Sequence, residues 1–198
     1  IPSSVISIGQ GALSGSDSNY HWKLEKILVD INNPKFVSID GVLFEKDLKK
    51  IICYPSKKKE HFYIIPSSVT SIENYAFKGC CSLKYIKIPS SVTSIKDYAF
   101  KRCDSLKQIA IPSSVISIGK GAFSECSSLK QIKLPSSLIS IGDYAFAYCN
   151  SLKQITIPSS VISIGCGVFS GRCSYRPPLE KLFVDSHNPE FVSKDGVL

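Results

Sequence analysis

Cysteine is the residue type whose spacing in this chain most strongly suggests chemistry. Four of the eight cysteines, Cys80, Cys103, Cys126 and Cys149, follow one another at intervals of 23 residues. Residues stacked at one repeat position would have Cα atoms within disulfide range, but their Cβ directions would run parallel, which suits a disulfide poorly. Free cysteine is among the most buried residue types. We therefore expect these four thiols to be reduced and buried.

Among the other cysteines, one disulfide remains possible. Cys166 and Cys173 flank an irregular turn near the end of the chain, where they could pair or stay reduced. Cys81 directly follows a cysteine of the 23-residue series and is expected to point outward. Cys53 has no evident partner.

The spacing of the other reactive residue types argues against a metal site and against catalysis. The chain has no Cys-x-x-Cys motif, and His21, His61 and His187 are far apart, as expected of surface loops. The serines of the recurring Pro-Ser-Ser segment are not placed beside a base. Asp97 and Asp143 fill a repeat position, which offers the same environment many times, whereas an acid–base pair needs two different ones. We expect no enzyme and no cofactor.

The series of four cysteines is one part of a sequence repeat of 23 residues. In each unit, Leu-x-x-Ile-x-Ile predicts a short strand with one apolar face, and the proline that follows ends the strand. One unit cannot bury its apolar residues alone, whereas stacked units bury each of them against its own copies. The Ile-Pro or Leu-Pro dipeptides begin at Ile65, Ile88, Ile111, Leu134 and Ile157, and the phenylalanines of the series are Phe77, Phe100, Phe123, Phe146 and Phe169.

The repeat predicts an α/β-type solenoid that is mostly β. Leu-x-x-Ile-x-Ile at this period is the leucine-rich-repeat signature. We expect a right-handed superhelix with a parallel β-sheet on one face and short turns or 3-10 segments opposite. Serine stands where an asparagine usually follows the strand, and its hydroxyl could take over part of the hydrogen bonding of the turn. These serines are Ser91, Ser114, Ser137 and Ser160.

The unit "IPSSVTSIxxYAFxxCxSLKxI" resembles the BspA-like leucine-rich repeat, the class with 23-residue units. The resemblance covers essentially the whole chain, including the segment "VDINNPKFVSIDGVLFEKDLKKIICYP" at residues 29–55, since members of the family carry similar inserts. It implies a surface or secreted protein of the kind found in mucosal bacteria and protozoa. Such proteins are implicated in attachment to host proteins and to other microbes.

We expect residues 1–198 to form a single solenoid. Regular repeats span 65–178, and irregular inserts that contain a β-hairpin span 24–64 and 179–198, with Asp40-Gly41 as the hairpin turn of the first insert. Residues 1–43 and 157–198 are near duplicates, which indicates a longer repeat of about 156 residues and a segment of a longer array. No stretch approaches the roughly 20 apolar residues of a transmembrane segment. No signal peptide is visible.

The residues expected to point outward from the strands form a candidate binding face. It is rich in lysine, within a chain of net charge +8. The lysines could be a hydrated rim that resists aggregation, or a basic stripe that binds acidic proteins or sulfated glycans. Nucleic acid is disfavoured because Tyr85 is the only aromatic residue expected there. The face comprises Lys84, Tyr85, Lys87, Lys107, Gln108, Lys130, Gln131, Lys133, Lys153, Gln154 and Thr156.

Two functions remain open at this point. The first is a non-catalytic protein-interaction module of a surface or secreted adhesin, which binds host or microbial surface proteins through the solenoid face. The second is a structural spacer or stalk without a ligand of its own. The low variation among the outward residues favours low-specificity contact or a spacer over a finely tuned receptor.

Overall fold

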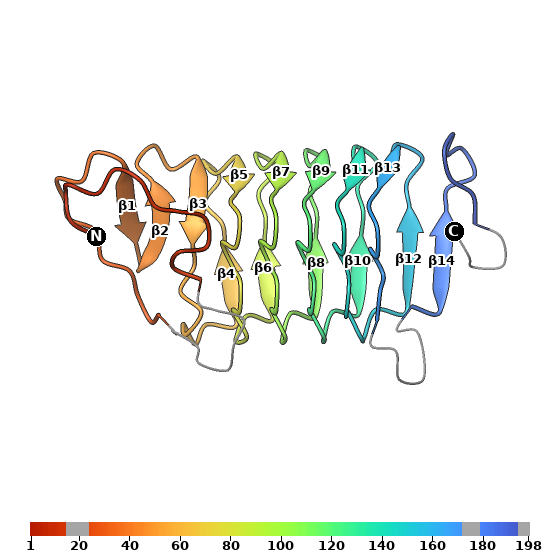
Figure 1. Ribbon diagram of the computed structural model, residues 1–198, viewed down its shortest axis with the longest axis horizontal. Coiled ribbons are helices and arrows are strands. Elements are labelled where there is room, and N and C mark those ends of the chain that lie inside the picture. The colour runs from red at the N-terminus through yellow and green to blue at the C-terminus, as the bar shows by residue number, and fades with distance from the viewer. Residues whose placement is uncertain (15–23, 172–178, 194–198) are drawn as a thin grey trace.

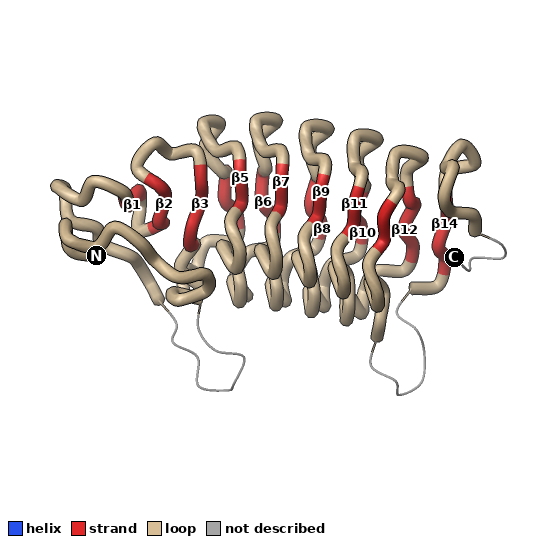
Figure 2. Tube along the Cα trace, turned by 45° about the horizontal axis from the view of Figure 1, so that its top comes forward, coloured by secondary structure: helices blue, strands red, loops and turns tan. Residues whose placement is uncertain are grey.

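The chain forms an elongated stack of coils. The computed structural model describes residues 1–14, 24–171 and 179–193. The N-terminal coils lie at one end of the stack and the C-terminal coils at the other (Figure 1). Within these ranges the structure consists of strands joined by turns and loops, without helices (Figure 2). The expected solenoid of mostly β structure is therefore confirmed.

One face of the solenoid is a parallel sheet made by the Leu-x-x-Ile-x-Ile segments. Neighbouring strands pair in register with the repeat, so that Ile86 lies beside Ile109 and Ile109 beside Ile132. This confirms the parallel sheet that the sequence predicts. Its strands are β4 (Phe62–Ile64), β6 (Tyr85–Lys87), β8 (Gln108–Ala110) and β10 (Gln131–Lys133), followed by the pair β12 (Gln154–Ile157) and β14 (Lys181–Val184).

A second parallel sheet lies opposite the first. It is built from two-residue Ser-Ile strands, whose isoleucines point into the core. The sequence predicts short turns or 3-10 segments on this side, so the second sheet is a correction. The Tyr-Ala-Phe segments between the sheets form turns. The Ser-Ile strands are β5 (Ser71–Ile72), β7 (Ser94–Ile95), β9 (Ser117–Ile118), β11 (Ser140–Ile141) and β13 (Ser163–Ile164).

The first insert extends this second sheet. β1 (Phe36–Ile39) and β2 (Val42–Glu45) form the antiparallel hairpin expected around Asp40-Gly41, and both turn residues have positive φ. β3 (Lys50–Cys53) pairs antiparallel with β2 and parallel with β5. The hairpin therefore continues the row of coils at the N-terminal end (Figure 1).

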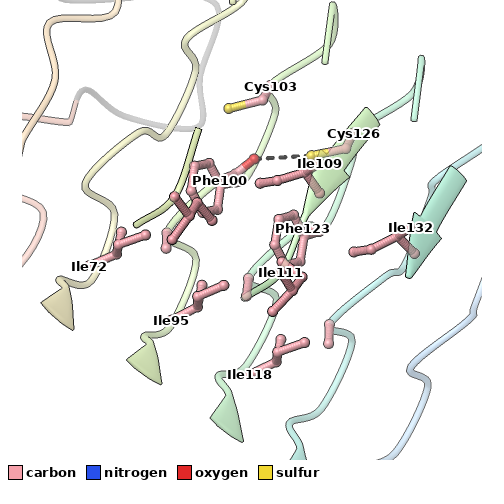
Figure 3. Packing of buried hydrophobic residues seen from close by; sticks show 14 of the residues in the cluster. Ile72, Ile95, Phe100, Cys103, Ile109, Ile111, Ile118, Phe123, Cys126 and Ile132 are labelled. Carbon is pink, nitrogen blue, oxygen red and sulfur yellow. Dashed lines mark hydrogen bonds between the residues drawn. The ribbon is translucent and has the colours of Figure 1, made fainter. Parts of the chain in front are cut away.

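The core lies between the two sheets and consists of columns of identical residues. The rings of Phe77, Phe100 and Phe123 stack with centroids 5.0 and 5.1 Å apart, and isoleucines of both sheets pack around them (Figure 3). Tyr54 stacks on Phe77 at 5.3 Å and carries the column into the insert. Each ring buries its faces against its copies in the adjacent coils, which one coil alone could not do.

Serine hydroxyls replace the usual asparagine in the turns, as the sequence predicts. The Oγ atom of Ser91 donates a hydrogen bond to the carbonyl oxygen of Val69 in the preceding coil, at 2.6 Å. Ser137 repeats this bond with Val115 at 2.8 Å. Each hydroxyl satisfies a backbone acceptor of the neighbouring coil, so the turns join adjacent units.

No helix within the described ranges is long and apolar enough to cross a membrane. The right-handed sense of the superhelix and the limits of the domain stay predictions.

Candidate binding face

The residues of the candidate binding face project from the sheet of β4, β6, β8 and β10 and from the neighbouring pair β12 and β14. In β6, β8 and β10 the middle residue is buried and the two flanking residues are exposed, because side chains alternate along a strand. All the predicted residues of the face are exposed except Lys84, which is half-exposed. The structure thus brings the predicted residues together on one surface.

A row of lysines runs along the solenoid axis where the chain enters these strands. The backbone N–H of Lys107 donates to the carbonyl oxygen of Lys84 at 3.1 Å, and that of Lys130 donates to Lys107 at 3.0 Å. These bonds place neighbouring lysines about one strand spacing, ~4.8 Å, apart. Because the like charges repel one another, their ammonium groups remain hydrated.

The positive row is compensated at its C-terminal end. The Nζ atom of Lys153 forms an exposed ion pair with Glu180, at 2.8 Å from its Oε1 atom. Beyond it, hydrogen bonding from the backbone N–H of His187 lowers the pKa of Asp185, which therefore remains a carboxylate at neutral pH. The most positive part of the face accordingly lies over β6, β8 and β10.

An open groove of about 860 Å³ crosses the face between β10 and β12. These strands contact one another but belong to different hydrogen-bonded sheets. The polar lining of the groove includes Gln131, Lys133, Gln154, Thr156 and Asp185, and isoleucine, leucine and proline side chains also line it. The groove therefore offers amide, hydroxyl, ammonium and carboxylate groups next to apolar surface.

The face also contains apolar residues that the sequence analysis missed. Phe62 and Ile64 of β4 lie beside Tyr85 and Lys87 of β6 and are 53% and 55% exposed. Phe183 of β14 is exposed at the other end. Tyr85 is therefore not the only aromatic residue on this surface, which corrects the prediction. Counting back 23 residues from Tyr85 and Lys87 would have identified Phe62 and Ile64.

The four repeated cysteines are buried and reduced, as predicted. The Sγ atom of Cys126 donates to the carbonyl oxygen of Phe100 in the preceding coil at 3.1 Å (Figure 3). Burial raises the pKa of the Cys126 thiol well above its usual value. Cys81 is exposed, as expected, and so is Cys166. The proposed partner of Cys166, Cys173, lies outside the described residues.

The aspartates considered for catalysis bond to backbone groups, and the histidines that the structure describes are exposed. His61 and His187 are exposed, and His21 lies outside the described residues. Asp97 accepts a hydrogen bond from the backbone N–H of Lys120, and Asp143 accepts one from Cys166. These carboxylates therefore link adjacent coils.

The described ranges contain no group of three or more His, Cys, Asp or Glu residues that could hold a metal ion. Two of the tyrosines next to Ala-Phe pack between coils, since the Tyr75 and Tyr98 rings stack at 5.1 Å, whereas Tyr144 is exposed.

Comparison with known proteins agrees with this architecture. A crystal structure of a leucine-rich repeat protein from Eubacterium ventriosum is 28% identical, with a TM-score of 0.62 over 89% of this chain and 59% of that one. A leucine-rich cell surface protein from Faecalibacterium prausnitzii is 33% identical, with a TM-score of 0.66 over 76% of this chain and 42% of that one. This chain thus spans less than two thirds of either relative. No curated protein matches it.

The family model for the BspA-type leucine-rich repeat region matches residues 46–176 in six copies. Leucine-rich repeat proteins generally act as protein-interaction modules, and their extended surfaces are the usual binding sites. The repeat, the sheets and this match together identify the chain as a member of the BspA-type leucine-rich repeat family.

Proposed function

We propose that this chain is a non-catalytic binding module of a surface or secreted adhesin-like protein. It binds acidic macromolecules of host or microbial surfaces through the outward face formed by the sheet of β4, β6, β8 and β10 and by the neighbouring pair β12 and β14. The lysine row carries this proposal: Lys84, Lys107 and Lys130 are held at one-coil spacing by backbone hydrogen bonds on a continuous sheet. A preformed array of like charges attracts an oppositely charged partner and positions it.

The family resemblance and one structural relative support a location at the cell surface. The relative from Faecalibacterium prausnitzii is described as a cell surface protein. Most exposed side chains over the central strands are polar or basic, with Tyr85 and Ala110 as the exceptions, which suits contact with hydrated, acidic surface polymers.

The proposal is tested by chromatography on two acidic matrices, immobilised heparin and immobilised polyglutamate. We expect at least one of them to retain the chain at low salt. We also expect the fourfold variant Lys84→Gln, Lys107→Gln, Lys130→Gln and Lys153→Gln to elute at lower salt. A matched control removes four exposed lysines outside this face, with the changes Lys35→Gln, Lys46→Gln, Lys49→Gln and Lys120→Gln.

Equal elution of the two variants would refute the role of the lysine row. Failure of both matrices to retain the chain would favour the spacer function. The repetition of glutamine at Gln108, Gln131 and Gln154 is the observation that keeps this second candidate in view, because a spacer needs no tuned contact residues.

A further inference from the structure

We propose that the ligand is a linear sulfated polysaccharide that lies along the solenoid axis, across β6, β8 and β10. This inference rests on the proposed function, since it names the partner class and the orientation for the same face. Three features of the face carry it: the spacing of its charges, the amides between them, and the placement of its apolar residues.

The charges repeat at distances that suit a polysaccharide. Lys84, Lys107 and Lys130 recur at every coil, about 4.8 Å apart. A second, shorter row consists of Lys87 and Lys133, which lie two coils apart with Ala110 between them. One pyranose ring of an extended chain spans about one coil, so a disaccharide spans about two. Sulfates that recur once per sugar or once per disaccharide therefore stay in step with both rows.

The groups between the lysines suit sugar hydroxyls. Gln108 and Gln131 lie side by side on adjacent strands and are both exposed. A side-chain amide both donates and accepts hydrogen bonds, as a sugar hydroxyl does. At the N-terminal end, Phe62 and Tyr85 are neighbours on adjacent strands and both are exposed, so their aromatic side chains offer apolar surface for the face of a pyranose ring.

The same features argue against a protein or nucleic-acid ligand. Side chains on one face of an extended peptide repeat about every 6.8 Å, out of step with coils about 4.8 Å apart. Protein interfaces also concentrate apolar anchors at their centre, whereas Phe62, Ile64 and Phe183 lie toward the two ends of this face. Single-stranded nucleic acids need successive aromatic platforms, which β8 and β10 lack.

The first test measures binding of heparin-derived oligosaccharides of increasing length, from disaccharide to octasaccharide, by titration calorimetry. We expect affinity to rise with length until the oligosaccharide covers the lysine row. The triple variant Lys107→Gln, Lys130→Gln and Lys133→Gln should lose about tenfold in affinity or more. The triple control Lys46→Gln, Lys49→Gln and Lys120→Gln should change by less than about twofold.

The second test removes the compensating charge at the end of the row. Glu180→Gln releases Lys153 from its ion pair, so octasaccharide affinity should rise by about twofold. Glu45→Gln is the matched control, because it breaks the Lys50–Glu45 ion pair of the opposite sheet and removes the same charge. It should leave affinity unchanged.

Polyglutamate and single-stranded DNA serve as competing polyanions, and desulfated heparin as the charge control. If polyglutamate binds through the lysine row and the oligosaccharides do not, the proposed function stands and this inference falls. Tighter binding of the DNA, or affinity that is independent of oligosaccharide length, also overturns it. If no anionic polymer binds, both proposals fail.

Discussion

The buried thiols form a continuous column that follows the axis of the solenoid. Cys103, Cys126 and Cys149 each donate to a phenylalanine carbonyl of the preceding coil, at 3.1 to 3.2 Å. Cysteine is small and tolerates an apolar site, and its weak S–H donor gives this carbonyl a partner. The same residue type therefore recurs at this position for packing rather than for reactivity.

The thiol column predicts a loss of stability in alkali. Burial raises the pKa of Cys103, Cys126 and Cys149, so the folded chain keeps these thiols protonated at pH values where the unfolded chain ionises them. The free energy of unfolding should be fully retained below the ordinary cysteine pKa of 9.0 and should fall above it. Each thiol contributes a slope of up to about 1.4 kcal/mol per pH unit.

Urea denaturation under reducing conditions, from pH 8 upward, measures this slope. Cys126→Ala removes one of the thiols and should make the alkaline slope shallower by the contribution of that thiol. Identical slopes in the wild type and the variant would contradict the assignment.

A second residue-scale prediction concerns Gly121, which has a φ of 56°. A Cβ atom added there would lie 2.5 and 2.6 Å from two ring carbons of Tyr98. Gly121→Ala should therefore destabilise the chain by more than the roughly 1–2 kcal/mol of left-handed backbone strain. In the background Tyr98→Gly, which removes the ring, the same change should cost less. Thermal denaturation of the four chains of this double-mutant cycle measures the coupling, and strict additivity would exclude the ring contact.

At the scale of elements, the turn of the first insert depends on one buried side chain. Asn33 is 1% exposed and makes four hydrogen bonds. Its Nδ2 group donates to the carbonyl oxygens of Pro2 and Val5, and its Oδ1 atom accepts from the backbone N–H groups of Lys35 and Phe36. Asn33 thereby fastens the turn before β1 to residues near the start of the chain.

Replacing this side chain should be costly. Asn33→Ala leaves one buried and three partly buried backbone groups without these partners, so the free energy of unfolding should fall by about 2–4 kcal/mol. The adjacent, exposed Asn32 provides the control, and Asn32→Ala should change stability by less than about 0.5 kcal/mol. Asn188 makes the equivalent bonds in the second insert. Similar losses for Asn33→Ala and Asn32→Ala in urea denaturation would refute this role.

The elements that the sequence predicted are those that follow the 23-residue period or a strong turn signal. The strands of the first sheet, the phenylalanine column and the Asp-Gly hairpin belong to this group. The Ser-Ile strands were missed because two residues are too few to show an alternating pattern. Tyr54 was missed in the aromatic column although it precedes Phe77 by 23 residues, because tyrosine replaces phenylalanine there and the flanking residues of the insert do not match the repeat.

The residues of the candidate face were likewise predictable where they follow the 23-residue period. Alternation along the strands identified its central residues, such as Gln108 and Lys133. The ion pair between Lys153 and Glu180 was not predictable, because the two residues are 27 positions apart across an irregular coil. Inserts thus change the ends of the face, whereas the repeat determines its centre.

At the scale of the whole molecule, contacts between strands join neighbouring coils, as β6 joins β8 and β7 joins β9. The stability of such a solenoid is approximately a sum of coil terms and interface terms between neighbours. A destabilising substitution in one coil should therefore lower the stability of the adjacent coils more than that of distant ones. The end coils should open first, because each of them has one stacking interface instead of two.

Phe123→Ala in the central coil tests this behaviour. Loss of the buried ring should cost about 3–5 kcal/mol of unfolding free energy. Hydrogen exchange measured by mass spectrometry should then rise most in β8 to β11, because the Phe123 ring stacks on both Phe100 and Phe146. Phe123→Leu fills most of the space and should show a smaller effect with the same pattern. A uniform rise in exchange from β5 to β13 would instead mean that the solenoid opens as one cooperative unit, with its coils coupled far beyond their nearest neighbours.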